Sequence, residues 1–195
     1  RVDRIQALTF ERVGQTLSVD LIAVKHCADA ATFVRISRIV SEICTLPLVL
    51  MSDDPAALRK VLEYLKEKKP LLYKATAENA AAFGALAKEF ACPLAVQGAD
   101  LEGLIALTGQ FKSMGVEGLV LDPIGATISQ KIWDFTQIRR QALKKSNRAL
   151  GYPTIAVIES SDPYEEAMLA ATYISKYAGI VLMRGIESWQ ILPLL

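Results

Sequence analysis

Short apolar runs recur along the chain at a nearly constant pitch of about 25 residues, which leaves room in each interval for one strand, one helix and two short loops. Each run is continuous and not alternating, a pattern typical of strands buried on both faces of an all-parallel sheet. The runs cover residues 21–24, 48–51, 71–73, 94–96, 119–121, 155–158 and 180–183. We therefore expect seven strands, starting near residues 21, 48, 70, 93, 118, 154 and 179.

Segments with helical spacing separate the runs, for example Phe33, Ile36, Val40 and Ile43. Several signals mark where these helices begin and end. A carboxylate precedes proline at Asp54-Pro55 and at Asp162-Pro163, which favours a helix start. Thr76 is expected to cap the helix that runs through Phe83, Leu86 and Phe90, and Gly115 is expected to end the next helix after Met114.

The repeat predicts an α/β fold, a (β/α)8 TIM-type barrel, as a single domain over residues 1–195. An open doubly wound sheet is the alternative. It usually has about five or six strands and a glycine-rich phosphate loop, and the sequence has no G-x-G-x-x-G. Residues 2–13 have the pattern of a helix, with Ile5, Leu8 and Arg12 along one side. We therefore expect the first strand of the barrel upstream of Arg1, and the start of the last helix within residues 187–195.

Composition argues against several classes of protein. The 22 Lys and Arg residues nearly balance the 21 Asp and Glu residues and are interspersed with them, so neither a nucleic acid nor an anionic membrane surface is an expected partner. No apolar run approaches the roughly 20 residues that cross a bilayer.

The three cysteines, Cys27, Cys44 and Cys92, are far apart and odd in number, which fits a reducing cytoplasm better than a disulfide framework or a metal knuckle. The chain also begins without Met, as a segment of a longer protein or a trimmed chain would.

Polar residues follow the predicted strands, where barrel enzymes place their working groups. The resulting rim consists of Lys25, His26, Ser52, Asp53, Lys74, Thr76, Gln97, Asp122, Glu159, Ser160 and Arg184. A small anion or a pterin could bind there, with Asp122 or Glu159 bonded to ring nitrogens and Lys74 or Arg184 to a carboxylate. The candidate contacts are Lys74, Gln97, Asp122, Glu159 and Arg184. Helix capping or interface contacts are the alternative for all of them.

The sequence predicts no catalytic residue and no metal site. His26 is the only histidine, which excludes a histidine-based triad and a multi-histidine metal site. As a lone general base it would need an orienting partner, and Asp53 is the candidate. The segment 144–148 (KKSNR) contains three basic residues, which are expected to complement the end of a helix dipole or to form a docking patch.

Several stretches resemble the large (gamma) subunit of the corrinoid iron–sulfur protein of the acetyl-CoA synthase/decarbonylase pathway. They occur in the order found in that family and cover nearly the whole chain. The matching stretches include 10–15 (FERVGQ), 19–24 (VDLIAV), 69–76 (KPLLYKAT), 120–123 (VLDP), 134–140 (DFTQIRR), 150–154 (LGYPT) and 171–181 (ATYISKYAGIV).

The resemblance implies a methyl carrier of one-carbon metabolism, in which a cobalt corrinoid (cobalamin) accepts a methyl group from a methyltetrahydropterin and passes it to acetyl-CoA synthase. It also implies a four-iron (4Fe-4S) cluster domain, a central barrel and a corrinoid domain, and this chain matches the barrel alone. No cofactor residue can be carried over to it. The implied partners are a small corrinoid-protein subunit in a heterodimer, a methyltransferase and acetyl-CoA synthase.

Two functions follow from the sequence. The first is a non-catalytic scaffold and interaction barrel within the methyl carrier. The second is a free-standing TIM-barrel methyltransferase that uses a tetrahydropterin bound at the rim.

Overall fold

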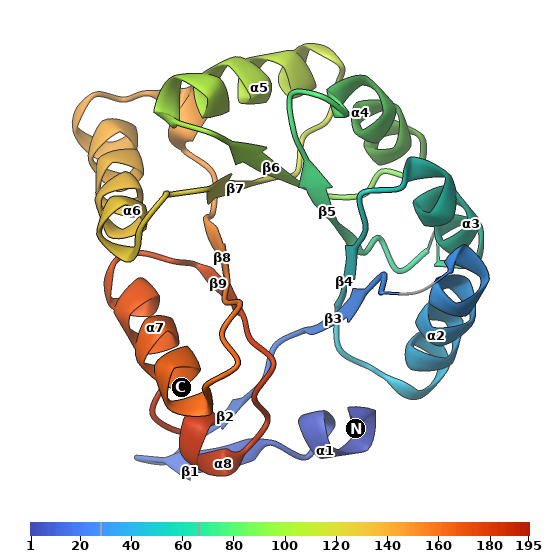
Figure 1. Ribbon diagram of the computed structural model, residues 1–195, viewed down its shortest axis with the longest axis vertical. Coiled ribbons are helices and arrows are strands. Elements are labelled where there is room, and N and C mark those ends of the chain that lie inside the picture. Colours follow the sequence, from blue (N-terminus) through green and yellow to red (C-terminus); the bar gives the residue numbers. More distant parts are fainter. Residues whose placement is uncertain (28, 66) are drawn as a thin grey trace.

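Seven parallel strands form a ring in the computed structural model, which describes residues 1–27, 29–65 and 67–195 (Figure 1). The strands are β3 (Ile22–Lys25), β4 (Leu48–Met51), β5 (Leu71–Ala75), β6 (Leu94–Gly98), β7 (Leu119–Pro123), β8 (Ile155–Val157) and β9 (Ile180–Leu182). Strands β3 to β7 form one five-stranded sheet and β8 pairs with β9; a bridge between Leu121 and Thr154 joins the two sheets. The predicted strands and their parallel arrangement are confirmed.

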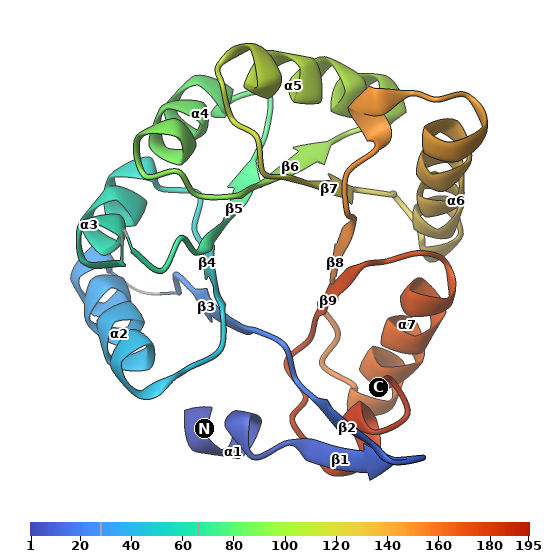
Figure 2. The same ribbon diagram turned by 180° about the vertical axis from the view of Figure 1, so that it is seen from behind.

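Helices lie outside the ring and follow its strands in turn (Figure 2). They are α2 (Ala30–Ile43), α3 (Pro55–Leu65), α4 (Ala80–Glu89), α5 (Leu101–Ser113), α6 (Ile128–Lys144) and α7 (Pro163–Ser175), with a short 3-10 turn, η1 (Arg148–Leu150). The expected last helix is present as the single turn α8 (Ser188–Ile191). In the part of the chain that the structure describes, none of these helices has the length and apolar character needed to cross a membrane.

The expected helix over residues 2–13 is wrong. A short helix, α1 (Val2–Gln6), is followed by an antiparallel hairpin of β1 (Thr9–Arg12) and β2 (Gln15–Ser18). Val13 and Gly14 both have positive φ, at 51° and 76°, as a tight two-residue hairpin turn requires. The tight turn therefore prevails over the weak helical pattern, and residues 9–18 form a hairpin instead of a helix.

The hairpin and α1 lie at the opening of the ring between β9 and β3 (Figures 1 and 2). On one side, the Arg1 guanidinium donates to the backbone carbonyl of Arg184 at 2.7 Å, and Arg4 pairs with Glu187 at 2.9 Å. On the other side, Gln6 donates to the carbonyl of Ile43 at 3.2 Å. Helix α1 thus ties the two ends of the ring together, and among the described residues no strand pairs with the outer edge of β3 or β9. The placing of a further strand upstream of Arg1 stays a prediction.

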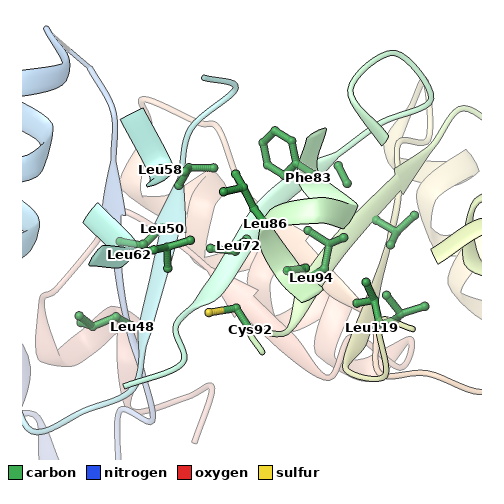
Figure 3. Packing of buried hydrophobic residues seen from close by; sticks show 14 of the residues in the cluster. Leu48, Leu50, Leu58, Leu62, Leu72, Phe83, Leu86, Cys92, Leu94 and Leu119 are labelled. Atoms are coloured by element: carbon green, nitrogen blue, oxygen red, sulfur yellow. The ribbon is translucent and has the colours of Figure 1, made fainter. Parts of the chain in front are cut away.

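Alternate residues of the strands point to opposite faces and contribute to three hydrophobic clusters, of which two lie between strands and helices and one lies inside the barrel. Outward-facing Leu50, Leu72 and Leu94 pack against the helices, with Leu58 of α3 and Phe83 of α4 among their neighbours (Figure 3). The inward-facing residues fill the barrel interior; they are Val49, Leu71, Tyr73, Ala95, Val120, Ile155 and Leu182. Strands β4 to β7 are buried on both faces, which is why they appear as continuous apolar runs, whereas β3 at the opening of the ring exposes Ala23 and Lys25.

Most of the predicted helix ends are confirmed. The Asp54 carboxylate accepts from the backbone N–H of Ala56 at 2.8 Å, and that of Asp162 accepts from Tyr164 at 2.9 Å. Gly115 follows the last residues of α5 with φ 86°. The cap expected at Thr76 is wrong: α4 begins at Ala80, after Asn79.

The side chain of Asn79 explains this difference, because its Oδ1 accepts from the backbone N–H of Thr76 at 2.8 Å. A local side-chain bond of this kind extends the turn before the helix starts.

Truncating a central residue of the outer core should destabilise the fold. Leu94→Ala removes a fully buried side chain from β6, and we expect the free energy of unfolding to fall by about 2–5 kcal/mol. Urea unfolding followed by circular dichroism measures this change. Leu143→Ala is the control, because Leu143 is 64% exposed on α6; a fall of similar size in the control would contradict the assignment of the core.

Candidate functional site

A cavity of about 320 Å³ opens at the carboxyl ends of the strands. Its lining comprises Lys25, His26, Met51, Ser52, Asp53, Tyr73, Lys74, Gln97, Asp122, Lys131, Val157 and Glu159. We call this cavity the mouth. Pockets of this size suit small molecules.

Strand periodicity explains why polar groups gather in the mouth. Successive side chains of a strand point to opposite faces, so residues two apart share a face. Gln97 is two residues after the interior Ala95, and Asp122 is two residues after the interior Val120. Their Cα atoms are also partners in the β6–β7 register. The inward face therefore changes from apolar to polar at the same level in both strands.

Asp122 is the centre of the mouth's hydrogen-bond network and is only 1% exposed. Its Oδ2 accepts from the Tyr73 hydroxyl at 2.8 Å and from Gln97 Nε2 at 2.8 Å. Its Oδ1 accepts from Lys131 Nζ at 3.3 Å. A buried carboxylate is tolerated when donors and a cation compensate for its lost hydration, and Asp122 has both.

The Tyr73 hydroxyl is held in its protonated form. Burial raises the pKa of Tyr73 well above its usual value, and the neighbouring negative charge of Asp122 and the hydrogen bond to it raise the pKa further. Tyr73 therefore acts as a fixed hydrogen-bond donor within the barrel.

Lys131 reaches the mouth because of the turn between β7 and α6. Gly125 adopts φ 56°, and a Cβ on it would lie 2.6 Å from the Cα of Lys131. Only glycine allows so close a contact between the turn and the helix. The Lys131 ammonium also lies 6.0 Å from the ring centre of Phe135 and 5.8 Å from that of Tyr173. These contacts hold the cation beside Asp122.

An ion pair at the mouth joins two strands that are not neighbours in the ring. Lys25 Nζ, at the end of β3, lies 3.1 Å from Glu159 Oε1, beyond the end of β8. The two side chains are 59% and 73% exposed, so this pair contributes only about 0–1 kcal/mol to stability. It can therefore open without great cost to the fold.

His26 is oriented by Ser52 and not by Asp53. His26 Nδ1 lies 2.8 Å from Ser52 Oγ, which also accepts from the backbone N–H of Asp54 at 3.1 Å. The imidazole stacks on Phe33 with ring centres 4.8 Å apart. Its Nε2 is buried and has no hydrogen-bond partner among the described residues. The carboxylate–histidine pair considered from the sequence does not form.

The structure gathers four of the five candidate contacts, Lys74, Gln97, Asp122 and Glu159, around the mouth. Arg184 is not among the lining residues: its backbone N–H donates to the buried Glu166, and its carbonyl accepts from Arg1. The rim residues Thr76 and Ser160 are not among the lining residues either. Whether any of these residues binds a ligand stays a prediction.

Sequence reasoning missed Tyr73 and Lys131. Tyr73 lies within an apolar run. Its contact with Asp122 becomes evident only when it is known which alternate side chains of β5 point into the barrel. Lys131 lies on a helix, and no local pattern connects it with the strand ends. Its position depends on the close packing at Gly125.

The three cysteines differ in their burial. Cys44 and Cys92 are buried, and burial raises the pKa of the Cys92 thiol to about 11. Cys27 is exposed. Within the described ranges, no group of three or more histidine, cysteine or acidic side chains is placed to hold a metal ion.

The whole chain matches one protein family. The model of the CO dehydrogenase/acetyl-CoA synthase delta subunit (CdhD) covers residues 1–195. The chain belongs to this family. It is 44% identical to the corrinoid/iron-sulfur protein large subunit of Moorella thermoacetica, over all of this chain and 44% of that protein. It is 34% identical to the acetyl-CoA decarbonylase/synthase complex subunit gamma of Methanothermobacter thermautotrophicus, over all of this chain and 45% of that protein.

These matches confirm the resemblance to the large (gamma) subunit. The chain spans less than half the length of these relatives.

Solved structures confirm the barrel fold. The chain is similar to Yersinia pestis DHPS with a pterine-sulfa conjugate, with a TM-score of 0.61 and 10% identity over 95% of both chains. It is also similar to the Yersinia pestis dihydropteroate synthase–sulfonamide drug complex, with a TM-score of 0.56 and 9% identity over 95% of this chain and 96% of that one. At such low identity the likeness establishes the fold alone.

The raised pKa of Tyr73 predicts a loss of stability in alkali. The unfolded chain releases this proton near pH 10 whereas the folded protein keeps it, so the contribution is complete below pH 10 and declines above it. Above about pH 10, the free energy of unfolding of the wild type should fall more steeply than that of Tyr73→Phe, by about 1.4 kcal/mol per pH unit. Urea unfolding between about pH 8 and 11 tests this, with Tyr64→Phe at an exposed position as control. Equal slopes for wild type and Tyr73→Phe would contradict it.

Proposed function

We propose that this chain is a non-catalytic scaffold and interaction barrel of a corrinoid iron–sulfur methyl carrier. The support is a family match over residues 1–195 and relatives that are named as corrinoid/iron-sulfur and acetyl-CoA decarbonylase/synthase subunits. In this role the carrier moves a methyl group from a methyltetrahydropterin to acetyl-CoA synthase. The corrinoid and the 4Fe-4S cluster belong to other parts of the full-length protein.

The bonding within the mouth carries this proposal. Asp122 accepts three hydrogen bonds from protein donors, Lys25 pairs with Glu159, and the only histidine bonds to Ser52. A catalytic base must instead be within reach of the proton that it removes, with acceptor capacity left for it. The central acid of the mouth is thus already occupied by protein donors, as suits a rigid spacer between other domains.

The proposed partners follow from the same assignment. The barrel would pair with the small corrinoid-protein subunit in a heterodimer, and the assembled carrier would meet a methyltransferase and acetyl-CoA synthase in the cytoplasm. Residues 1–195 would act as a single barrel domain in that assembly.

Metal analysis of two proteins tests the scaffold role. We expect the full-length protein to contain iron and cobalt and to bind the purified small subunit. We expect residues 1–195 expressed alone to contain neither metal. Inductively coupled plasma mass spectrometry measures the metals, and circular dichroism establishes that the shorter protein is folded. Tight binding of cobalamin by residues 1–195 would contradict the proposal.

A second candidate is a methyltransferase that binds a tetrahydropterin in the mouth. The observation in its favour is the cavity itself, where Asp122, Gln97 and Lys131 present acceptors and donors at fixed positions. A fused polar ring system needs such a mixed set of partners. The structurally similar DHPS, which is described with a pterine-sulfa conjugate, has the same fold at 10% identity.

Titration with methyltetrahydrofolate separates the two functions. Under the scaffold role, calorimetry should show no saturable binding to the wild type. Under the methyltransferase role, the wild type should bind saturably and Asp122→Ala should reduce affinity by at least about tenfold, because it removes the central acceptor of the mouth. Glu78→Ala, at an exposed position, is the control.

A further inference from the structure

A second cavity lies on the outer wall of the barrel, between α2 and α3. It has a volume of about 410 Å³. Its lining consists of Ala31, Val34, Arg35 and Arg38 from α2, and Lys60 and Tyr64 from α3. We call it the α2–α3 groove. Three of its six lining residues are cationic and none is acidic, although the whole chain carries a net charge of only +1.

Two residues of the groove are held in place before any partner binds. The Arg38 guanidinium lies over the Tyr64 ring, 5.4 Å from its centre. Its Nε also donates to Glu42 Oε1 at 3.0 Å. Because the planar guanidinium is already oriented, less side-chain entropy is lost when it forms further hydrogen bonds.

The other two cations keep their charge available. In residues 1–27, 29–65 and 67–195, no carboxylate lies within ion-pair distance of Arg35 or Lys60. Another cation of α3 differs: Arg59 makes two hydrogen bonds to Glu89, at 2.7 and 2.6 Å. The positive charge of Arg59 is thus balanced within the chain. In the groove only Arg38 has a carboxylate partner, and the charges of Arg35 and Lys60 are not balanced in this way.

We propose that the α2–α3 groove docks an acidic segment of a protein subunit with which this barrel assembles. This inference rests on the proposed role as an interaction barrel. The cations of the groove come from both helices, so an extended acidic segment lying across the groove would meet positive charge on each side. Ala31 and Val34 add apolar contact area between them. Tyr64 is 61% exposed, and tyrosine and arginine are among the residue types enriched in the hot spots of interfaces.

Charge reversal tests the proposal. The full-length protein with Arg35→Glu and Lys60→Glu is titrated with the purified small corrinoid-protein subunit, methyltransferase and acetyl-CoA synthase, each at low and high salt. For the subunit that docks in the groove, we expect Kd to rise at least about tenfold and its increase with salt to weaken or reverse, because attraction is replaced by repulsion. Circular dichroism melting checks the fold of each variant.

The matched control reverses the same number of charges elsewhere. Lys112→Glu with Arg140→Glu changes exposed residues of α5 and α6 that lie outside the groove, and it should leave Kd within about twofold of the wild type. If the groove variant binds every subunit like the wild type, or if the control loses as much affinity, the groove proposal is overturned while the proposed function stands.

A second arm keeps the test independent of the proposed function. If no subunit binds the wild-type protein, the interaction role itself fails. A fluorescent amphipathic peptide rich in Glu and Leu is then titrated against the wild type and the groove variant. Saturable, salt-sensitive binding to the wild type that the groove variant loses supports the groove, whereas equal binding or none overturns it.

Discussion

Burial of both faces of the parallel strands is the constraint on which the rest of this structure depends. Leu50, Leu72 and Leu94 face the helices, while Val49, Leu71 and Val120 face the barrel interior. Each strand can satisfy both faces only if helices cover the outside and other strands enclose the inside. The ring, the outer layer of helices and the mouth at the strand ends all follow from this requirement.

The mouth shows how polar groups are accommodated at the end of that apolar interior. Asp122 is buried, so three donors compensate for its lost hydration, and this requirement fixes Tyr73, Gln97 and Lys131 around it. The same bonds that position these side chains also occupy them. The mouth is therefore an ordered cavity whose central carboxylate is already bonded within the chain.

The outer surface of the barrel is where an interaction role would operate. Elsewhere on α3 a cation is neutralised within the chain, as with Arg59 and Glu89, but the α2–α3 groove retains Arg35 and Lys60 beside an oriented Arg38. At the opening of the ring, α1 is tied to the β9–α8 loop by Arg4 and Glu187 and to the end of α2 by Gln6. The barrel wall and its opening thus offer different chemistry to partners.

The sequence by itself determined the seven strands, because short apolar runs recur at a nearly constant pitch and alternate with segments of helical spacing. It also determined that Gln97, Asp122 and Glu159 lie at or just beyond the carboxyl ends of strands, and so share one rim. The hairpin at Val13-Gly14 was missed because a short helical pattern and a tight turn compete locally, and pairing between β1 and β2 decided between them. Only the tertiary structure decided that Tyr73 and Lys131 meet at Asp122, and that the backbone N–H of Arg184 donates to Glu166. Those contacts join residues far apart in sequence or on different kinds of element, and the packing of strands and helices, not any local pattern, sets the distances between them.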